Sequence, residues 1–404
     1  MRDIGVMLVG VLGHLSLVIL TGASLLKKGL YPVTGMVTAR DEFNALGLID
    51  PGKLVFGGWD IRFGSPEEKA RQYLVDTLLI DAGHFRAVAD DLKAVERHIF
   101  AGTYMNCGKT IGALADTQGC MSQIAARDIF ERLRGDIRDF RSRADVDNVI
   151  VVNLGSTEPP LPVSEEHHFS PDAVLRCVND DRQEFLRAGT LYSMAAIQEN
   201  CAYINFTPSS SALLPGIVRL AENMRVPVMG NDGKTGETLV KSALSSMFRS
   251  RNLEVLSWEG FNILGNMDGK VLDDQENRQS KIESKDALLP SILGYTPHTH
   301  VHIGYVPSLG DQKTAWDFIH FKGFLEAKMS LQFIWQGFDS ILAAPLVLDI
   351  VRLVEFALRS GEYGLMPHLA SFFKAPLGVH EHRLHEQFRI LSNYVSARTD
   401  RGPV

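Results

Sequence analysis

The segment IGVMLVGVLGHLSLVILTGASLLKK, residues 4–28, combines a short apolar run, a glycine turn and a longer apolar stretch. The run Gly5–Val9 predicts a buried strand, and the residues after the turn predict a helix that ends near Lys28. In this arrangement, backbone N–H groups at the start of a helix can hold a pyrophosphate. The turn has Leu12 and Ser16 where a dinucleotide-binding fingerprint has glycines, so a purely structural tight turn also explains it. The candidate cofactor-contacting residues of the turn are Gly10, Val11, Leu12, Gly13, His14 and Leu15.

The same segment raises the alternative of a membrane anchor. Residues 4–26 carry no Asp, Glu, Lys or Arg, and a stretch of this length could span a bilayer. However, it contains several Gly, Ser and Thr residues, and the charges before it are balanced, with no cleavage signal of a signal peptide. A buried strand, turn and helix is therefore the preferred interpretation, with no membrane partner. A membrane-anchored protein would instead sediment with lipid.

Further along the chain, short apolar runs alternate with helical patterns. Predicted strands are Lys53–Trp59, Asn148–Leu154, Cys201–Phe206 and Val226–Met229. Strands that alternate with helices predict an α/β fold with a parallel sheet, and its sites lie at the carboxyl ends of the strands.

Small polar or acidic residues stand at several of these strand ends. Asp60 follows the second strand, where an acid can bind the hydroxyls of an adenosine ribose. It comes much later than the usual ~20 residues after the glycine turn, so a long excursion must separate the first two strands. The other strand ends contribute Ser156, Thr157, Thr207, Pro208 and Asp232 as candidate cofactor contacts. Their convergence favours a dinucleotide site more strongly than the turn does alone.

The pattern changes after Asp232 and predicts a second, smaller α+β domain. Residues 1–236 and 339–404 are expected to form a Rossmann-like dinucleotide-binding domain, and residues 237–338 the second domain. Within the smaller domain, His298, His300 and His302 alternate and so share one strand face. Three histidines could ligate a metal, but a polar sheet face or a subunit contact is the preferred interpretation, since no nearby carboxylate completes a site.

Lysines and carboxylates with the spacing of a reactive site gather between residues 230 and 285. Asp232 and Asp268 each lie in a glycine-flanked turn, and Lys281 and Lys285 are four residues apart. On a helix this spacing puts both ammonium groups on one face, which suits an anionic substrate. A solvated basic turn is the alternative. Lys374, in FFKAPL, is either snorkelling to the surface or held in a site that lowers its pKa.

Composition excludes some classes of protein. The 404 residues are 45% hydrophobic and carry a net charge of -7, which argues against a general nucleic-acid partner. The four cysteines form no CxxC pair and are interpreted as reduced thiols of a cytoplasmic protein without a zinc site.

Nine ordered motifs together resemble the myo-inositol-1-phosphate synthase family, although no single one is decisive. The resemblance is good from about residue 134 to residue 377 and thin before residue 40. The motifs are, in order, GGWDI; RGDIRDFR with DNVIVVNLGSTEP; AYINFTPSSSALLPGIVRLAE; GNDGKTGETLVKSAL; FNILGNMDG; RQSKIESK; YVPSLGDQKTAWD; DSILAAPLVLDIV; and FFKAPL.

The resemblance implies an NAD-dependent sugar-phosphate cyclase that is an isomerase with no net redox change. The family converts glucose 6-phosphate to an inositol phosphate by oxidation, enolisation, intramolecular aldol closure and re-reduction. It also implies a cytoplasmic homotetramer whose small-domain sheet builds much of the interface. Whether the enzyme also needs a monovalent or divalent cation as a further cofactor stays open.

The resemblance also implies roles for individual residues. Lys281 resembles the lysine that polarises the oxygen at the oxidised carbon, and Lys374 resembles the one that transfers a proton there. Lys285 and Lys313 resemble lysines that contact the phosphate and the reacting end of the sugar. Asp232, Asp268 and Asp339 match acids that orient these lysines or the cofactor. The remaining matched positions are Asn266, Thr235, Gly236 and Leu264 on the substrate side and Ser340 on the cofactor side.

Departures from the family pattern leave two alternatives. The glycine turn is eroded to GVLGHLS, Met267 replaces the second asparagine of GNND, and Pro159 stands where the family has an arginine. The loops expected around the ligand thus differ from the family pattern, whereas the four lysines at the matched positions are kept. A diverged cyclase that forms a five-membered cyclitol phosphate from fructose 6-phosphate therefore stays open. The other alternative is a non-catalytic, NAD-binding regulatory relative.

Overall fold

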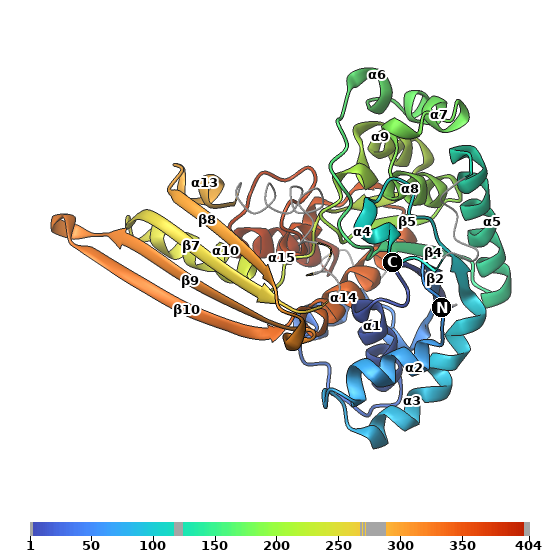
Figure 1. Cartoon of the computed structure of the whole chain (residues 1–404), viewed down its shortest axis with the longest axis horizontal. Helices are drawn as coiled ribbons and strands as arrows, with labels where there is room; N and C mark the ends of the chain where they lie inside the picture. Colours follow the sequence, from blue (N-terminus) through green and yellow to red (C-terminus); the bar gives the residue numbers. More distant parts are fainter. Residues whose placement is uncertain (1–2, 117–123, 267–268, 270, 272–287, 400–404) are drawn as a thin grey trace.

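The first lobe is built on a seven-stranded parallel sheet (Figure 1). The computed structural model describes residues 3–116, 124–266, 269, 271 and 288–399. The strand order is β11-β6-β5-β4-β1-β2-β3, so the chain starts in the middle, builds one half of the sheet, and returns to build the other. The predicted parallel sheet is confirmed. The strands are β1 (Ile4–Val9), β2 (Leu54–Asp60), β3 (Ile99–Ala101), β4 (Val149–Asn153), β5 (Ala202–Asn205), β6 (Pro227–Met229) and β11 (Gly364–Leu365).

Both faces of this sheet are covered by helices, which explains why its strands are nearly continuous apolar runs. In β1, Val6 and Leu8 contribute to one core and Met7 and Val9 to the other. The first core includes α1 (His14–Lys27), α3 (Ala82–Val95), α14 (Asp339–Arg359) and α15 (Leu384–Thr399). The second includes α5 (Ala126–Ala144), α7 (Pro171–Asn179), α8 (Ala188–Gln198) and α9 (Pro215–Met224). Shorter helices are α2 (Pro66–Ala70), α4 (Lys109–Gly112) and α6 (Glu165–His168).

The predicted excursion between the first two strands is present. After α1 the chain runs through short 3-10 turns before β2 begins. These turns are fixed to α14, because Asp349 accepts hydrogen bonds from the backbone N–H groups of Val37 (2.7 Å) and Thr38 (3.0 Å). The excursion therefore packs against a helix that arrives some three hundred residues later in the chain.

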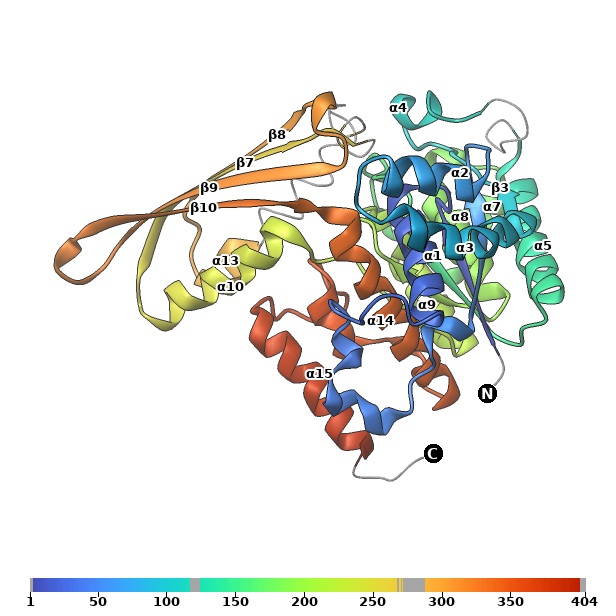
Figure 2. The ribbon, with the colours of Figure 1, turned by 90° about the horizontal axis from the view of Figure 1, so that it is seen from below.

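A second sheet of four strands projects away from the first lobe (Figures 1 and 2). Its order is β10-β9-β7-β8; β7 and β8 are parallel and the other pairs are antiparallel. Its elements are α10 (Gly236–Ser250), β7 (Glu254–Leu264), α13 (Leu288–Leu293), β8 (His298–Tyr305), β9 (Gln312–Lys322) and β10 (Lys328–Phe338).

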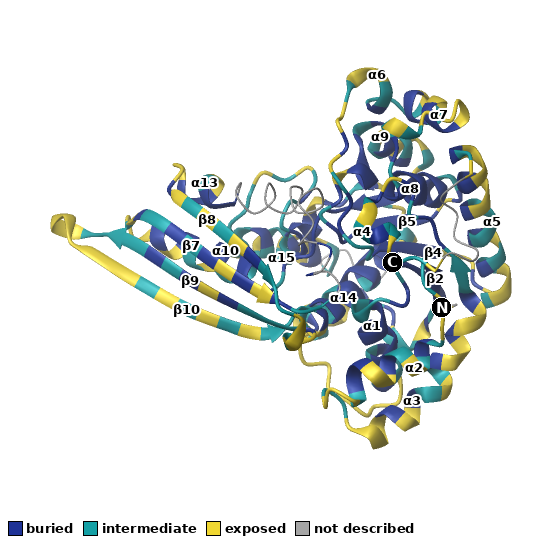
Figure 3. Cartoon of the chain, in the orientation of Figure 1, coloured by how far each residue is buried: buried dark blue, intermediate teal, exposed yellow. Residues whose placement is uncertain are grey.

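One face of the second sheet is covered and the other is open. Phe248 of α10 and Leu289 of α13 pack with Trp258 and Ile319 of the sheet. On the opposite face the side chains of Phe261, Trp316 and Ile334 are exposed by 36% or more. Exposed and less exposed positions alternate along the strands of this sheet (Figure 3). The alternation along the strands thus leaves an apolar row without cover in the single chain.

Some predicted boundaries were wrong. The sequence pattern predicts a strand at Leu253–Trp258, but β7 extends to Leu264. The sequence pattern also predicts one helix at Asp181–Asn200, but this segment is divided into a 3-10 turn and α8. Across the described parts of the chain, none of the helices is long and apolar enough to cross a membrane. The division into domains at residues 237 and 338 stays a prediction.

Candidate active site

A cavity of about 310 Å³ lies at the carboxyl ends of the central strands of the first sheet. Its walls come from the glycine turn after β1, the end of β2, the loops after β4, β5 and β6, and the first turn of α14. Residues from the second lobe also line it, because Asn266 follows β7 and Asp311 precedes β9. The cavity is therefore placed where the strand order of the parallel sheet reverses, which is the usual position of a ligand site in such sheets.

The glycine turn is tightly closed although two expected glycines are missing. Gly10 adopts φ +82, a conformation that glycine reaches without strain. The Gly13 N–H donates to the Gly10 carbonyl (2.9 Å), and the Ser16 hydroxyl donates to the same carbonyl (2.7 Å). Gly13 is the N-cap of α1 and has no side chain to cap the helix. The first-turn N–H groups of α1 thus remain available to an anion such as a pyrophosphate.

Asp60 connects the end of β2 to this turn. Its side chain is 2% exposed. It accepts hydrogen bonds from the backbone N–H groups of Leu12 (2.7 Å) and Arg62 (2.9 Å). The Arg62 guanidinium lies 3.3 Å from the same carboxylate. This fixed carboxylate lines the cavity, as a ribose-binding acid must. The turn and the acid therefore fit a dinucleotide.

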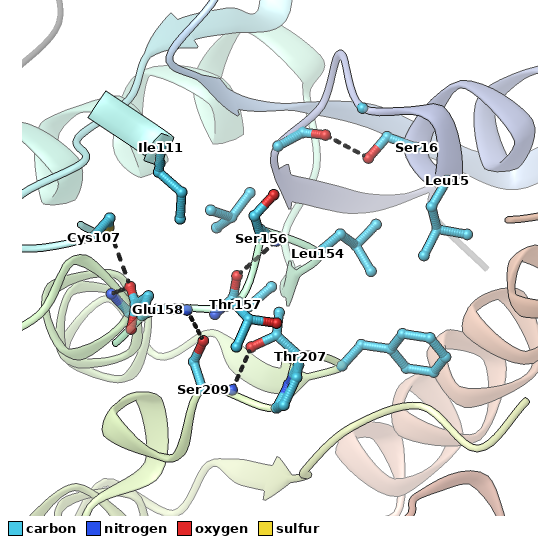
Figure 4. A pocket seen from close by; sticks show the side chains of 18 of the residues that line it. Leu15, Ser16, Cys107, Ile111, Leu154, Ser156, Thr157, Glu158, Thr207 and Ser209 are labelled. Carbon is cyan, nitrogen blue, oxygen red and sulfur yellow. Dashed lines mark hydrogen bonds between the residues drawn. The ribbon is translucent and has the colours of Figure 1, made fainter. Parts of the chain in front are cut away.

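The opposite wall is a hydrogen-bonded pair of loops after β4 and β5 (Figure 4). The Glu158 N–H donates to the Ser209 hydroxyl (3.0 Å), and the Ser209 N–H donates to the Thr207 hydroxyl (3.1 Å). The Glu158 carboxyl accepts from Ser211 (2.6 Å), and burial raises the pKa of Glu158. These bonds hold Ser156, Thr157, Thr207 and Pro208 along the cavity, where the sequence predicted cofactor contacts.

The predicted pairing of lysines with aspartates is present. Lys374 Nζ donates to Asp232 Oδ1 at 2.9 Å, and both side chains are about nine-tenths buried. The backbones are joined as well, because the Lys374 N–H donates to the Asp232 carbonyl (2.7 Å) and Gly233 bridges to Phe373. Two segments separated by about 140 residues thus meet as one rigid unit. The Lys374 side chain is therefore buried and paired with a carboxylate, and it does not extend to the surface.

A second pair lies beside the first turn of α10. Lys313 Nζ is 3.4 Å from Asp339 Oδ2. Gly236, the first residue of α10, adopts φ +54 next to this pair. Thr235, the N-cap residue, makes no side-chain capping bond. The site therefore has a second helix start without a side-chain cap, close to a lysine.

A buried carboxylate that the sequence analysis did not select links the two lobes. Asp311 accepts hydrogen bonds from Ser340 (2.7 Å), Asn266 (2.9 Å) and the Tyr73 hydroxyl, and the His14 ring lies 3.3 Å away. Burial alone would raise the pKa of Asp311, but these hydrogen bonds together hold it below its usual range. Burial, followed by the charge of Asp311, raises the pKa of Tyr73.

Lys234 is the second residue that the sequence analysis missed. It is 1% exposed, and its ammonium group donates to Gln387 of α15. Burial lowers the pKa of Lys234 to about 7, and the nearby positive charge of Lys374 contributes. The GNDGK motif contained this residue, but nothing in the motif indicates that a helix from the end of the chain covers it.

Most of the predicted site residues converge, and some do not. Val11 and Leu12 are buried, and their N–H groups donate to the Trp59 carbonyl and to the Asp60 carboxylate. Leu264 packs against Ile303. Gly236 and Lys313 adjoin the cavity without lining it. Asp268, Lys281 and Lys285 lie outside the described residues. The predicted residues that line the cavity are Gly10, Gly13, His14, Leu15, Asp60, Ser156, Thr157, Thr207, Pro208, Asp232, Thr235, Asn266, Asp339, Ser340 and Lys374.

Within the described ranges, no group of three or more His, Cys, Asp or Glu side chains is suited to hold a metal ion. Fold and cavity together define a Rossmann-type dinucleotide-binding protein whose second lobe reaches into the cofactor site.

The chain belongs to the myo-inositol-1-phosphate synthase family, whose NAD-binding family model matches residues 4–396. It is 33% identical over 401 residues to inositol-3-phosphate synthase 1 of Bacteroides thetaiotaomicron, covering 94% of this chain and 91% of that protein. The crystal structure of inositol-3-phosphate synthase from Caenorhabditis elegans superimposes with a TM-score of 0.89 at 25% identity, covering 98% of this chain and 86% of that one. A myo-inositol-1-phosphate synthase-related protein from Thermotoga maritima gives a TM-score of 0.80 at 25% identity, with 97% and 99% covered. The family places this chain among isomerase-type enzymes with an NAD-binding domain.

Proposed function

We propose that the protein is an NAD-dependent cyclase that converts glucose 6-phosphate to an inositol phosphate with no net redox change. The observation that carries this proposal is the Lys374–Asp232 pair, which lines the same cavity as the Gly10 turn and Asp60. A cofactor held by the turn supplies hydride transfer at the sugar, and the pair supplies a proton-transfer group on another wall of the same cavity.

Lys374 takes or delivers the proton at the carbon that is oxidised and later reduced. Asp232 fixes the position of its ammonium group, because the 2.9 Å bond holds Nζ while the paired backbones hold the loop. A group held in this way loses little entropy on reaching the reactive geometry. Lys281, Lys285 and Asp268 are assigned to carbonyl polarisation, phosphate contact and orientation only by the family resemblance, so their roles stay predictions.

The phosphate of the substrate is assigned to the first turn of α10. The N–H groups at this helix start have no side-chain cap, and Lys313 brings a positive charge close to them. Helix starts and lysines both favour phosphate oxygens. Asp339 orients Lys313 through their ion pair.

The alternative is a five-membered cyclitol phosphate made from fructose 6-phosphate. It is favoured by a further departure at Thr235-Gly236-Glu237, where the resemblance implies Ser-Gly-Gln beside the phosphate, so that Glu237 stands in place of a glutamine. The Glu237 carboxylate is buried and paired with Lys241 at 2.6 Å. The substrate end of the site is therefore altered while the Lys374–Asp232 pair is kept.

Assembly as a homotetramer in the cytoplasm is part of the proposal, as is a monovalent or divalent cation beside the cofactor. The open face of the second sheet supports self-association. Phe261, Trp316 and Ile334 form one cross-strand row on it, and all three are exposed in the single chain.

Incubation of the purified protein with glucose 6-phosphate and fructose 6-phosphate separately, followed by NMR of the products, tests the proposal. The expected result is one cyclitol phosphate and unchanged total NAD. Denaturing the protein should release NAD. Release of NAD without conversion of either sugar would favour the non-catalytic relative, and the absence of NAD as well would refute the dinucleotide assignment.

A further inference from the structure

Two side chains on the covered face of the second sheet carry buried polar atoms without a hydrogen-bond partner among the described residues. One is Trp335, whose indole Nε1 is shielded from solvent. The other is Asn262, which is 1% exposed and whose amide oxygen and nitrogen both lack a partner. Buried polar groups without partners are rare in native proteins, and each needs an explanation.

The two side chains face the same space. Asn262 of β7 and Trp335 of β10 are both paired with Ala315, which lies on β9 between them. Asp317 is two residues further along β9, on the same face as Ala315. Residues directly opposite each other in a sheet point to the same face. Asn262 and Trp335 therefore lie in one row, two strands apart, on the side covered by α10.

The first turn of α10 lies above this row. A Cβ atom added to Gly236 would be 3.8 Å from Trp335 Nε1 and 3.9 Å from Lys313 Nζ. A Cβ atom added to Gly260, which is next to Asn262 on the same face of β7, would be 2.8 Å from Glu237 Oε1. The helix start, Lys313, Trp335 and Asn262 therefore surround one region. Thr235 and Asp339, which line the cavity, are its neighbours.

The chemistry of these groups distinguishes what each can bind. The indole Nε1 only donates, as do the Lys313 ammonium group and the backbone N–H groups at the start of α10. The Asp339 carboxylate also lies there, with Oδ1 3.0 Å from the same added Cβ atom of Gly236, and it is paired with Lys313. The donors around it suit an anion with several acceptor oxygens. The Asn262 amide can both donate and accept, which is what a hydroxyl group needs.

We infer that Trp335 and Asn262 are two further substrate-binding residues, with Trp335 Nε1 donating to a phosphate oxygen and Asn262 binding a hydroxyl of the attached sugar. This inference rests on the proposed function, because it takes a sugar phosphate as the ligand. It also explains why three polar atoms remain unpartnered in a buried part of the single chain.

The test measures binding by calorimetry with the purified protein and its retained cofactor, using inorganic phosphate, glucose 6-phosphate and fructose 6-phosphate. Trp335→Phe keeps the aromatic ring and removes the donor, so it should weaken binding of inorganic phosphate and of the bound sugar phosphate roughly tenfold. Trp316→Phe, on the open face of the same sheet, is the matched control and should change neither affinity.

Asn262→Leu separates a binding role from a structural one. It should weaken sugar phosphate binding roughly tenfold and leave inorganic phosphate binding unchanged. Without ligand, its thermal unfolding midpoint should equal or exceed that of the parent, because an unpartnered amide is replaced by an apolar side chain of similar size. A lower midpoint with unchanged affinity would make Asn262 structural and overturn its assignment.

The outcomes separate the inference from the proposed function. If the parent binds the ligands and Trp335→Phe binds phosphate equally well, the Trp335 assignment is wrong and the proposed function stands. If the parent binds inorganic phosphate but neither sugar phosphate, the assignment of Asn262 falls. If the parent binds none of the three, the phosphate site of the proposed function is refuted along with both assignments.

Discussion

Replacing Lys234 with methionine should stabilise the protein at neutral and acidic pH. Burial lowers the pKa of Lys234 from 10.5 to about 7. At about 1.36 kcal/mol for each pKa unit, keeping Lys234 charged in the folded state lowers the free energy of unfolding by roughly 5 kcal/mol below pH 7. Lys234→Met also removes the hydrogen bond that Lys234 donates to Gln387, and an unpartnered buried acceptor costs about 1–3 kcal/mol. The expected net gain at pH 6.5 is therefore about 2–4 kcal/mol.

The direction of the pKa shift of Lys234 determines whether the stability of the protein rises or falls with pH. The unfolded lysine keeps its proton up to about pH 10.5, whereas the folded one releases it near pH 7. The folded state therefore binds fewer protons between these values, and the stability of the parent rises with pH across this window. The advantage of the methionine variant should shrink steadily from pH 7 and be gone by about pH 10.

Urea unfolding of parent and variant at pH 6.5, 8 and 9.5 measures this difference directly. Lys93→Met is the matched control, because the Lys93 side chain is 57% exposed; its effect should be small and independent of pH. A Lys234→Met variant that is less stable than the parent at pH 6.5, or a gain that does not change with pH, would refute the reasoning.

Three further predictions concern the cavity and the assembly. Lys374→Met should lower turnover about 10²–10⁴-fold while the protein still retains its dinucleotide; loss of the dinucleotide, measured by its absorbance after denaturation, would instead give Lys374 a cofactor role. Asp60→Asn should weaken dinucleotide affinity roughly tenfold in a fluorescence titration, and unchanged affinity would remove Asp60 from the cofactor site. Ile334→Glu, on the open face where this side chain is 66% exposed, should shift the sedimentation coefficient of the assembly towards that of smaller species; an unchanged coefficient would place the subunit interface elsewhere.

Five of the seven strands of the first sheet were predictable because their signal is local, whereas the short β3 and β11 were not predicted. Runs such as Val149–Asn153 are apolar throughout, as burial on both faces requires. The acid and hydroxyl residues after them were predictable for a related reason, since all parallel strands end at one edge. Asp60, Thr157 and Thr207 accordingly line one cavity.

The length of β7 was not predictable in the same way. Its last residues, from Glu259 to Leu264, alternate between an exposed apolar face and a covered one that includes Asn262. The expected pattern of apolar residues inside and polar residues outside is reversed there, so a prediction from hydrophobic periodicity alone ends the strand too early. The reversal coincides with the open apolar row and with the region proposed to bind the substrate.

The order of the motifs along the chain determined the family, the α/β class and most of the residues around the cofactor site, because each of these depends on neighbours in the sequence or on a common strand edge. The tertiary structure alone decided the rest. Tyr73 meets Asp311 across 238 residues, and Gln387 covers Lys234 from 153 residues away. Desolvation and hydrogen bonding depend on which atoms are close in space, so the pKa of Lys234 and the link between the lobes at Asp311 arise only when the chain has folded.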